Sequence, residues 1–506
     1  MESSVKPGGP LAAVDIGSNS FRLEIGQLAG SQQSGRYKRI DYLKDTVRLG
    51  AGLDANGMLS EEAAQRGLAC LRRFSARLTG FAPGQVRAVA TQTLREARNR
   101  NAFLLRAQEA LGYPIEVISG REEARLIYAG VAHLQPSEEP RLVIDIGGRS
   151  TELILGQGRT PLVAESFGVG CVSLSLRFFE GGRLTEASFR AAQVAAGAEL
   201  EEALRPFARE NWTRALGSSG TAGAVSQVLL AAGITDGRIT PEGLRWCIAR
   251  CLEAGQISLI DLPGLKTDRK AVLPGGLAIL YTLAANFGIE ELWPAKGALR
   301  QGVVIDLNER LLARQRGKAT DMRDATVAEL QQRFNADTAQ AARVGSVALA
   351  LFDAAVPDAE TDTRRELGWA CALHEMGLMV SHHDHHRHSA YLLAHVDAAG
   401  FSQSQQRRIA DLVLGQRGGL RKIEPQMASE TFAWQVLCLR LAAIKCHARG
   451  DVDAQALTLR ARGRDALLAW AKTAWPEAHP RTLYLLREEV AAWARSGPLR
   501  LVLPAS

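Results

Sequence analysis

The amino-acid sequence predicts an α/β protein with a duplicated core, followed by a helical region and a small C-terminal part. Three observations predict this class. A strand–turn–strand motif occurs twice, strands alternate with helices between and after its two copies, and a helical pattern fills most of the chain beyond residue 327. A chain of 506 residues suits about three domains.

The duplicated motif is the strongest of these signals. Residues 15–26 read DIGSNSFRLEIG, and residues 145–156 read DIGGRSTELILG. An apolar run typical of a buried strand comes before each aspartate, and Gly and small polar residues then lead into a second strand. Each copy is therefore predicted to be a β-hairpin, and the spacing, 145 − 15 = 130 residues, indicates a duplicated domain.

The remaining elements follow in chain order. Strands are predicted at 85–90, 115–118 and 214–217, and helices at 94–111, 121–134, 186–207 and onward to 286. A basic, polar stretch at 313–323 (ARQRGKATDMR) is predicted to be a linker, helices fill 327–447, and a last strand lies within 498–504. The predicted domains are residues 1–128, 129–312, 313–448 and 449–506.

Composition excludes several classes of protein. With 46% hydrophobic and 23% charged residues, the chain is globular rather than disordered, collagenous or coiled-coil. A net charge of +7 is mild for this length and does not indicate a nucleic-acid binder. The 51 arginines against 10 lysines reflect either a GC-rich coding preference or a need for guanidinium groups that bind phosphate.

The cysteines and the apolar stretches predict a cytoplasmic protein. Seven scattered cysteines without a CxxC pair indicate reduced thiols rather than a disulfide framework. The polar segment 1–10 does not resemble a secretory signal, and the longest mostly apolar stretch, 276–289, is too short to span a bilayer.

Three turns rich in Gly, Ser and Thr are candidate anion sites. Two lie inside the duplicated motif, and the third, GSSGT at 217–221, is predicted to join a strand to a helix N-terminus. Any one of them is as well explained as an ordinary turn, but three together favour phosphate binding, with nearby arginines as clamps. The candidate phosphate-binding residues are Ser18, Asn19, Arg22, Arg95, Gly147, Gly148, Arg149, Ser150, Thr151, Ser218, Ser219, Gly220, Thr221 and Arg269.

Carboxylates next to such turns predict a bound cation. Asp15 and Asp145 stand where a strand ends and its loop begins, and Glu152 lies on the outgoing strand of the second hairpin. Because phosphate repels a carboxylate unless a cation lies between them, Mg²⁺ is the expected cofactor, held by Asp15, Asp145 and Glu152. The alternative for Asp15 is a side chain that closes its own turn.

The helix start SGREEARLI at 119–127 supplies a candidate general base. Ser119 and Glu122 fit a capping box, which gives Glu122 a structural role and leaves Glu123 to face the cleft. Glu123 could then accept a proton from an attacking water. The alternative is a solvated first-turn glutamate stabilised by the helix dipole.

Histidines gather in the helical region, six of the ten between residues 382 and 395, just after His374 and Glu375. A metal site would explain them. A solvated, histidine-rich loop explains them equally simply, and we favour it.

These motifs make the sequence resemble the exopolyphosphatase/guanosine pentaphosphate phosphohydrolase (Ppx/GppA) family, most of all its longer bacterial exopolyphosphatases. The resemblance runs from residue 11 to residue 410 and is carried by DIGSNSFRL, TQTLREA, YPIEVISGREEARLIYAGV, LVIDIGGRSTEL, GSSGT, GALRQG and LHEMGL with HRHSAYLL. It implies an actin-like, RNase-H-like (ASKHA) two-lobe core, an HD-like helical domain, a small C-terminal α/β domain and a homodimer.

The implied activity is Mg²⁺-dependent hydrolysis of the terminal phosphate of inorganic polyphosphate. By resemblance, Glu123 takes the place of the catalytic glutamate, and Asp145 and Glu152 take the acidic positions that organise metal and water. The loops around Ser18, Gly148 and Ser219 correspond to the phosphate cradles, and Arg95 to a substrate-binding arginine.

Three departures from the family pattern stand out. The third Gly of DIGGGS is Arg149 here, which could add a phosphate contact or fill the pocket. Lys296 precedes GALR, where relatives commonly carry an acidic residue. The HD-type pair is His374–Glu375 without a clear later histidine partner, so we predict no catalytic metal in the helical domain.

Other functions remain open on the sequence. The same residues could hydrolyse guanosine pentaphosphate (pppGpp) to the tetraphosphate (ppGpp). A weakly catalytic polyphosphate- or alarmone-binding regulator is suggested by Arg149, although Glu123, Asp145, Glu152 and Arg95 together argue against it. A kinase of the actin-like superfamily is disfavoured by the resemblance.

Overall fold

The computed structural model of the protein describes residues 8–29, 35–316, 321–450, 453, 456–470 and 478–504. The chain forms two compact units, residues 1–319 and 320–506. The four predicted domains are a finer division, which stays a prediction. Most of the polar segment 1–10 lies outside the described residues, as do residues 317–320 of the predicted linker.

The first unit contains two five-stranded sheets of one topology. The first has the order β3-β2-β1-β4-β5 and the second the order β8-β7-β6-β9-β10. The strands of the first sheet are β1 (Leu11–Ile16), β2 (Phe21–Ala29), β3 (Arg36–Asp45), β4 (Val86–Ala90) and β5 (Ile115–Val117). Those of the second are β6 (Arg141–Ile146), β7 (Thr151–Gln157), β8 (Thr160–Phe167), β9 (Arg214–Ser218) and β10 (Leu292–Pro294).

The central strands confirm the predicted hairpins. β1 pairs with β2, and β6 with β7, in antiparallel fashion, whereas β4 and β9 run parallel to the central strands. The chain is therefore a duplicated α/β core of the actin-like fold. Each sheet with its own outer helices is called a lobe below, lobe I for the first and lobe II for the second.

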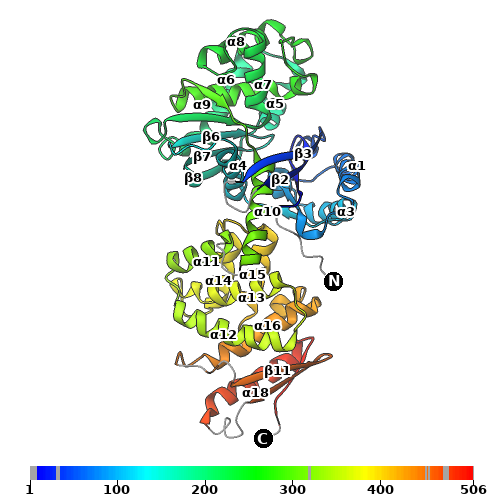
Figure 1. Cartoon of the computed structure of the whole chain (residues 1–506), viewed down its shortest axis with the longest axis vertical. Helices are drawn as coiled ribbons and strands as arrows, with labels where there is room; N and C mark the ends of the chain where they lie inside the picture. Colours follow the sequence, from blue (N-terminus) through cyan, green and yellow to red (C-terminus); the bar gives the residue numbers. More distant parts are fainter. Residues whose placement is uncertain are drawn as a thin grey trace. The chain divides into compact units, whose positions relative to one another are not determined.

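Side chains that alternate along each central strand face two different hydrophobic cores. In β1, Ala12, Val14 and Ile16 face the outer core of lobe I, whereas Leu11 and Ala13 face a core shared by both lobes. β6 behaves in the same way, with Val143 on the shared side. Two helices, α4 (Gly120–Leu134) and α10 (Leu299–Arg316), fill this shared core between the sheets (Figure 1).

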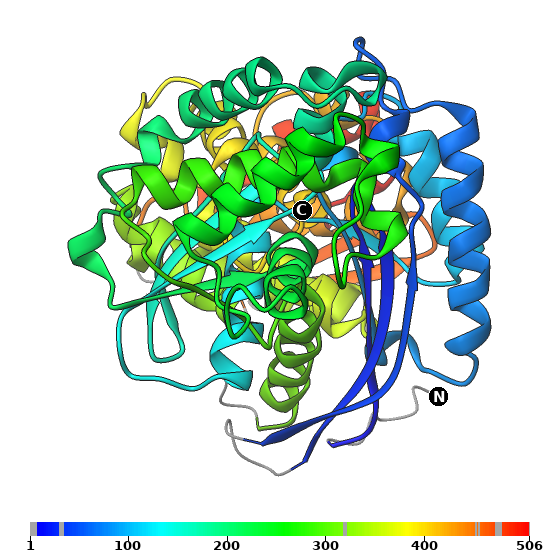
Figure 2. The same cartoon turned by 90° about the horizontal axis from the view of Figure 1, so that it is seen from above.

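The outer faces are covered by helices of each lobe. Helix α1 (Glu61–Arg77) packs beside the strands of lobe I, as the view from above shows (Figure 2). The remaining helices of the first unit are α2 (Gln92–Glu96), α3 (Arg100–Leu111), α5 (Cys171–Phe178), α6 (Glu186–Leu200), α7 (Ser219–Ala231), α8 (Pro241–Ala254) and α9 (Leu273–Asn286).

Three predicted element boundaries are wrong. The helix predicted at 94–111 is broken between α2 and α3, where the Asn99 side chain bonds the backbone N–H and C=O of Leu59 at 2.9 Å each. The helix predicted at 186–207 ends as an α-helix at Leu200, before Pro206, which cannot continue a helix. The linker predicted at 313–323 is shorter, because α10 runs to Arg316 and the next helix begins at Met322.

Glycines let α4 and α10 approach closely. A Cβ on Gly130 of α4 would lie 2.5 Å from the carbonyl oxygen of Ala298, and one on Gly302 of α10 would overlap the carbonyl oxygen of Leu126. Backbone therefore meets backbone at this crossing, which only glycine allows.

A buried charge cluster joins the same helices to the sheet of lobe I. Asp306 of α10 accepts hydrogen bonds from Arg87 of β4 (2.7 Å), Arg125 of α4 (2.6 Å) and Arg310 (2.6 Å), and Arg125 also pairs with Glu122. Burial alone would raise the pKa of Asp306, but the arginines hold it far below its usual value. Losing one member would leave its buried partners uncompensated, which typically costs about 3–5 kcal/mol.

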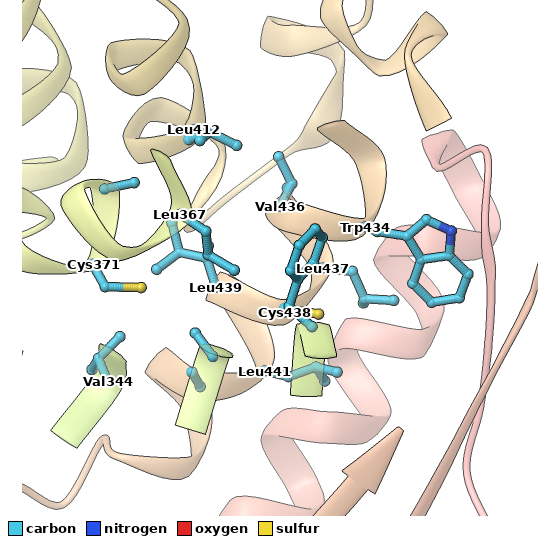
Figure 3. Close-up of a cluster of buried hydrophobic side chains, with 14 of the residues drawn as sticks. Val344, Leu367, Cys371, Leu412, Trp434, Val436, Leu437, Cys438, Leu439 and Leu441 are labelled. Atoms are coloured by element: carbon cyan, nitrogen blue, oxygen red, sulfur yellow. The ribbon is translucent and has the colours of Figure 1, made fainter. Parts of the chain in front are cut away.

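The second unit is a helical bundle closed by a small sheet. Its elements are α11 (Met322–Arg333), α12 (Thr338–Ala355), α13 (Thr361–Leu373), α14 (His385–His395), α15 (Gln403–Gly415), α16 (Glu430–Lys445), β11 (Leu457–Arg462), β12 (Asp465–Trp470), α18 (Pro480–Ser496) and β13 (Arg500–Val502). Side chains such as Val344, Leu367, Leu412 and Leu439 form its core (Figure 3), which continues into the sheet through Leu459. The HD-like character of this bundle stays a prediction.

In the part of the chain that the structure describes, no helix combines the length and the apolar character needed to cross a bilayer.

We predict that Gly302→Ala destabilises the first unit by about 3 kcal/mol, because its methyl group would overlap the backbone of α4 and no side-chain rotation can relieve this. Denaturant unfolding of the full-length protein measures the loss. Gly197→Ala in α6 is the control. Its methyl group would find its nearest neighbours at 3.8 Å, so this change should stabilise by about 0.5 kcal/mol. Equal effects of the two substitutions would contradict the close crossing.

Candidate active site

The two central strands end at one cleft between the lobes. Asp15 and Asp145 follow Ala13 and Val143 by two residues, so both carboxylates lie on the shared side of their strands. Both are buried and line the cleft together with the turns that follow them. The sequence prediction that these aspartates meet at one site is consistent with this arrangement.

Equivalent positions of the two hairpins carry opposite charges. Asp15 is paired across its hairpin with Arg22, whose Nη1 donates to Asp15 Oδ2 at 3.0 Å. At the equivalent position of the second hairpin, Asp145 faces Glu152, which accepts a hydrogen bond of 2.8 Å from the Ser166 hydroxyl. Lobe I thus neutralises its aspartate, whereas lobe II places two carboxylates side by side.

Glu123 enters the cleft from the first turn of α4. Ser119 is the N-cap and accepts from the backbone N–H of Glu122 at 3.2 Å, which confirms this half of the predicted capping box. The Glu122 side chain is buried and accepts from Arg125 at 2.7 and 2.9 Å, so its role is structural, as predicted. Glu123 is 7% exposed, so the alternative of a solvated glutamate is wrong. Arg95 Nη1 donates to Glu123 Oε2 at 2.8 Å and to the Ile118 carbonyl oxygen at 3.0 Å, which holds the carboxylate in place.

Burial and crowding shift the carboxyl groups of the cleft. Burial raises the pKa of Glu123 to about 7; Arg95 opposes this rise, and Asp15 and Asp145 add to it. Burial also raises the pKa of Asp145, and it raises that of Glu152 well above its usual value, with Glu123 and Asp145 contributing. Near neutral pH, Glu123 therefore exchanges readily between its ionised and protonated forms.

The three predicted turns line the cleft. Ser18, Asn19, Gly147, Gly148, Ser150, Ser219 and Gly220 lie on its surface, together with Arg22 and Arg269. The third turn joins β9 to α7 as predicted, and Ser219 has a φ of 62°, a left-handed conformation that a serine adopts only under constraint. The Ser219 hydroxyl donates to the Ile146 carbonyl oxygen at 3.2 Å, which ties this turn to the end of β6.

Other predicted residues lie behind the surface of the cleft. The hydroxyls of Thr151, Ser218 and Thr221 donate to backbone carbonyl oxygens of Val169, Gly297 and Ile146. Arg95 and Glu152 lie close to Glu123 in that second layer. The phosphate-binding roles of all these residues stay predictions.

Two polar atoms at the site lack a partner. Within the described ranges, the buried Ser20 Oγ and Arg95 Nη2 have no hydrogen-bond partner. Because a buried unpaired donor is costly, such atoms usually mark a site that something else completes. Ser20 lines the cleft, where its hydroxyl can donate to an anion, whereas Arg95 Nη2 lies behind the cleft's surface.

Sequence reasoning missed two polar residues of the cleft. Thr91 follows β4 in the TQT segment, and Arg300 belongs to GALR, so both lie in motifs that had been noticed for other reasons. Arg300 donates to Glu24 at 2.6 Å, a partner 276 residues away, and a pairing over such a separation leaves no local sequence signal.

Arg149 links the two lobes rather than lining the cleft. Its guanidinium bonds Glu96 of α2 at 2.7–2.9 Å and the Gly50 carbonyl oxygen at 3.2 Å, both in lobe I. A second link runs from Lys44 of β3 to Asp268 in lobe II at 2.9 Å. The lobes are thus joined by ion pairs in addition to the shared core.

The histidine-rich segment is mainly helical rather than the loop we favoured. Residues 385–395 form α14, in which His385 and His386 are buried. His374 ends α13, and the neighbouring Glu375 pairs with Arg449 at 2.8 Å. Across the described residues, no group of three His, Cys, Asp or Glu side chains is arranged to hold a metal ion.

The cleft lies between two copies of one hairpin-based sheet, and carboxylates and Gly/Ser turns line it. This arrangement defines a two-lobed protein with a duplicated, actin-like core. The Ppx/GppA phosphatase family matches residues 30–311, and domain III of Ppx/GppA phosphatases matches residues 322–490. The chain belongs to the Ppx/GppA phosphatase family and is a hydrolase of that family, which confirms the resemblance seen in its motifs.

Two solved structures are similar to this chain over about three fifths of its length. An exopolyphosphatase-like protein is 25% identical with a TM-score of 0.54, and the match covers 61% of this chain and 100% of that protein. An exopolyphosphatase from Cytophaga hutchinsonii is 22% identical with a TM-score of 0.53, over 60% of this chain and 98% of its own. Because the Cytophaga hutchinsonii protein is only 22% identical, its similarity shows a shared fold and nothing further.

We predict opposite shifts of the Glu123 titration for two substitutions. Arg95→Gln should move its midpoint above 7, because the nearby positive charge that favours the ionised form is lost. Asp145→Asn should move it below 7, because a repelling negative charge is lost. Infrared difference spectra across pH in metal-free buffer, assigned with Glu123→Gln, measure both, and shifts of the same sign would refute this electrostatic account.

We also predict that Arg149→Met loosens α2. The side chains of Arg149 and Glu96 are 21% and 32% exposed, so the pair contributes less than about 1 kcal/mol. Amide hydrogen exchange over residues 92–96 should become a few times faster. Arg159→Met, which removes an exposed pair with Glu309, is the matched control and should leave that exchange unchanged.

Proposed function

We propose that this protein is an exopolyphosphatase, which hydrolyses the terminal phosphate of inorganic polyphosphate with Glu123 as general base. The observation that carries the proposal is the setting of Glu123, a buried carboxyl group with a pKa of about 7 that lines the same cleft as the Gly/Ser turns and is held by Arg95. A base with a pKa near the working pH is well matched to taking a proton from water.

The reaction needs only water as a second substrate. The oxygen of a water molecule bonds to the terminal phosphorus, and the bond from that phosphorus to the bridging oxygen breaks. The bridging oxygen and its electron pair stay with the shortened chain. The water proton moves to a Glu123 carboxylate oxygen, and inorganic phosphate leaves.

The side chains around Glu123 have distinct tasks in this proposal. The backbone N–H groups and hydroxyls at Ser18, Gly148 and Ser219 bind phosphate oxygens, and Arg22 and Arg269 add positive charge. Arg95, behind the surface of the cleft, orients Glu123 through the bond from its Nη1. Together they position the terminal phosphate in front of the base.

The carboxylates of lobe II fit Mg²⁺. Asp145 and Glu152 are hard oxygen donors, opposite each other on paired strands; burial raises the pKa of Glu152, and the charges of Glu123 and Asp145 raise it further. A cation would lower that pKa again, and Mg²⁺ takes one or two carboxylates, with water and phosphate oxygens completing its coordination. Asp15 is a weaker candidate, because Arg22 already neutralises it. Bound there, Mg²⁺ would neutralise the charge of the phosphate oxygens.

The observation that suggested a weakly catalytic regulator no longer supports that alternative. It was suggested by an arginine that might fill the phosphate pocket, but Arg149 pairs with Glu96 and does not line the cleft. Hydrolysis of guanosine pentaphosphate uses the same chemical step and becomes an outcome of the test.

We predict that Glu123→Gln lowers kcat for phosphate release from long-chain polyphosphate by a factor of about 10²–10⁴, because the proton acceptor is lost. KM should change only a few-fold, since glutamine keeps the shape and can still bond Arg95. Phosphate release with Mg²⁺ measures both constants.

Glu165→Gln is the matched control. Glu165 lies in β8, outside the cleft, and pairs with Arg121 of α4, the helix that carries Glu123. It should leave kcat unchanged. Phosphate release from guanosine pentaphosphate but not from polyphosphate would show that the protein is a guanosine pentaphosphate phosphohydrolase. Full activity of Glu123→Gln would refute Glu123 as the general base.

A further inference from the structure

A cavity of about 590 Å³ opens in the second unit, where α18 meets the helical bundle, and the proposed reaction does not use it. Its volume lies within the range of about 300–1,000 Å³ that is typical of small-molecule sites. Buried polar side chains, half-buried apolar side chains and exposed charged side chains line it, and we call them its floor, walls and rim.

A buried ion pair fixes α18 against the bundle at this cavity. Arg440 of α16 bonds both carboxylate oxygens of Glu489 in α18, with 2.8 Å between Nη2 and Oε2, and its Nη1 donates to the Gly415 carbonyl oxygen at 2.8 Å. Glu375 is paired in the same way with Arg449, at 2.8 and 2.9 Å. The fold itself neutralises these charges, so other side chains of the cavity have to recognise a ligand.

His374 provides a hydrogen-bond acceptor on the floor. It is 3% exposed, and its Nδ1 lies 2.7 Å from the carbonyl oxygen of Cys371; because a carbonyl oxygen can only accept, Nδ1 carries the proton. Burial lowers the pKa of His374, so near neutral pH the ring is uncharged and Nε2 keeps its lone pair. Among the described residues no donor bonds this Nε2, and Glu375 Oε1, 3.9 Å away, is itself an acceptor. A ligand that reaches the floor therefore has to bring an N–H or O–H group.

The rim carries two arginines and one carboxylate that the fold leaves unpaired. Arg417 and Arg495 are exposed, and within the described ranges no carboxylate lies within ion-pair distance of either. Glu488 has no ion pair with a described residue, and it stands 495 − 488 = 7 residues before Arg495, about two helical turns along the same face of α18. Two arginines suit one phosphate group, whose charge is about −2, and a carboxylate suits hydroxyl donors.

Apolar side chains make up the walls. Leu378, Ala443 and Ile444 line the cavity from the bundle, and Leu485 lines it from α18. His385 is buried and also lines the cavity, and it has no hydrogen bond through its ring to a described residue. Aliphatic surface and histidine rings are what a flat heteroaromatic ring packs against. Inorganic phosphate has no apolar surface to place there.

We propose that this cavity is a nucleotide site, which takes a nucleoside monophosphate whose base carries an amino group. The amino group donates to His374 Nε2, and the base packs on the apolar walls. The ribose hydroxyls donate to Glu488, and Arg417 and Arg495 bind the phosphate. The cavity shares no residue with the cleft that contains Glu123, so the inference goes beyond the proposed function and does not depend on it.

Calorimetric titration of the full-length protein with adenosine monophosphate (AMP) tests the site. AMP should bind at least about tenfold more tightly than inosine monophosphate, which replaces the amino donor with an oxygen that would face the lone pair of His374. Inorganic phosphate should bind about a hundredfold more weakly than AMP, because the contacts of base and ribose are missing. Equal affinities for the two nucleotides, or no binding of AMP at about 1 mM, would overturn the proposal.

A double variant, Arg417→Met with Arg495→Met, locates the bound nucleotide. Both arginines are exposed, so the fold should tolerate the change, and the affinity for AMP should fall about 10–100-fold because the phosphate loses both guanidinium partners. Arg421→Met with Arg487→Met is the matched control, since it removes the same charge from exposed positions of the same two segments outside the cavity, and it should leave the affinity unchanged. AMP bound in the cleft of the first unit would keep its affinity in the first variant, and that result would overturn the proposal.

Discussion

The crossing of α4 over α10 is the contact on which the rest of the first unit depends. Gly130 and Gly302 bring the two backbones together, and Asp306 collects arginines from α4 and β4 in the same buried layer. Because α4 also carries Glu123 in its first turn, this packing fixes the position of Glu123 relative to both sheets. A small shift of α4 would therefore move Glu123 relative to Asp145, even if no residue of the cleft were substituted.

Charge is distributed unevenly around the cleft. Carboxylates gather at Glu123, Asp145 and Glu152, whereas Arg22, Arg269 and Arg300 line the same cleft. A phosphate group would be repelled by the carboxylates and attracted by the arginines. In the proposed function, a cation among the carboxylates would remove that repulsion, so the residues of both signs would act together on one substrate.

Local patterns predicted the parts of the site that depend on neighbouring residues. The hairpins with Asp15 and Asp145, the third turn before α7 and the N-cap that leaves Glu123 facing inward were all visible in the sequence. The break between α2 and α3 was not, because it depends on Asn99 bonding Leu59, 40 residues earlier. The partners of Arg149 and Arg300 were also out of reach, since they lie 53 and 276 residues away in the chain. Such pairs are set by tertiary packing and leave no periodicity to detect.

The difference between Arg22 and Glu152 bears on how such a cleft can arise. The two residues occupy the same position in copies of one hairpin, opposite Asp15 and Asp145. In a homodimer of a single repeat, both positions would have to carry the same side chain. The cleft would then hold either two neutralised aspartates or two repelling carboxylate pairs. Joining the repeats in one chain removes that symmetry, because each copy can then change alone. One half can anchor substrate charge while the other attracts a cation, and a division of labour becomes possible that no symmetric assembly of the single repeat could have.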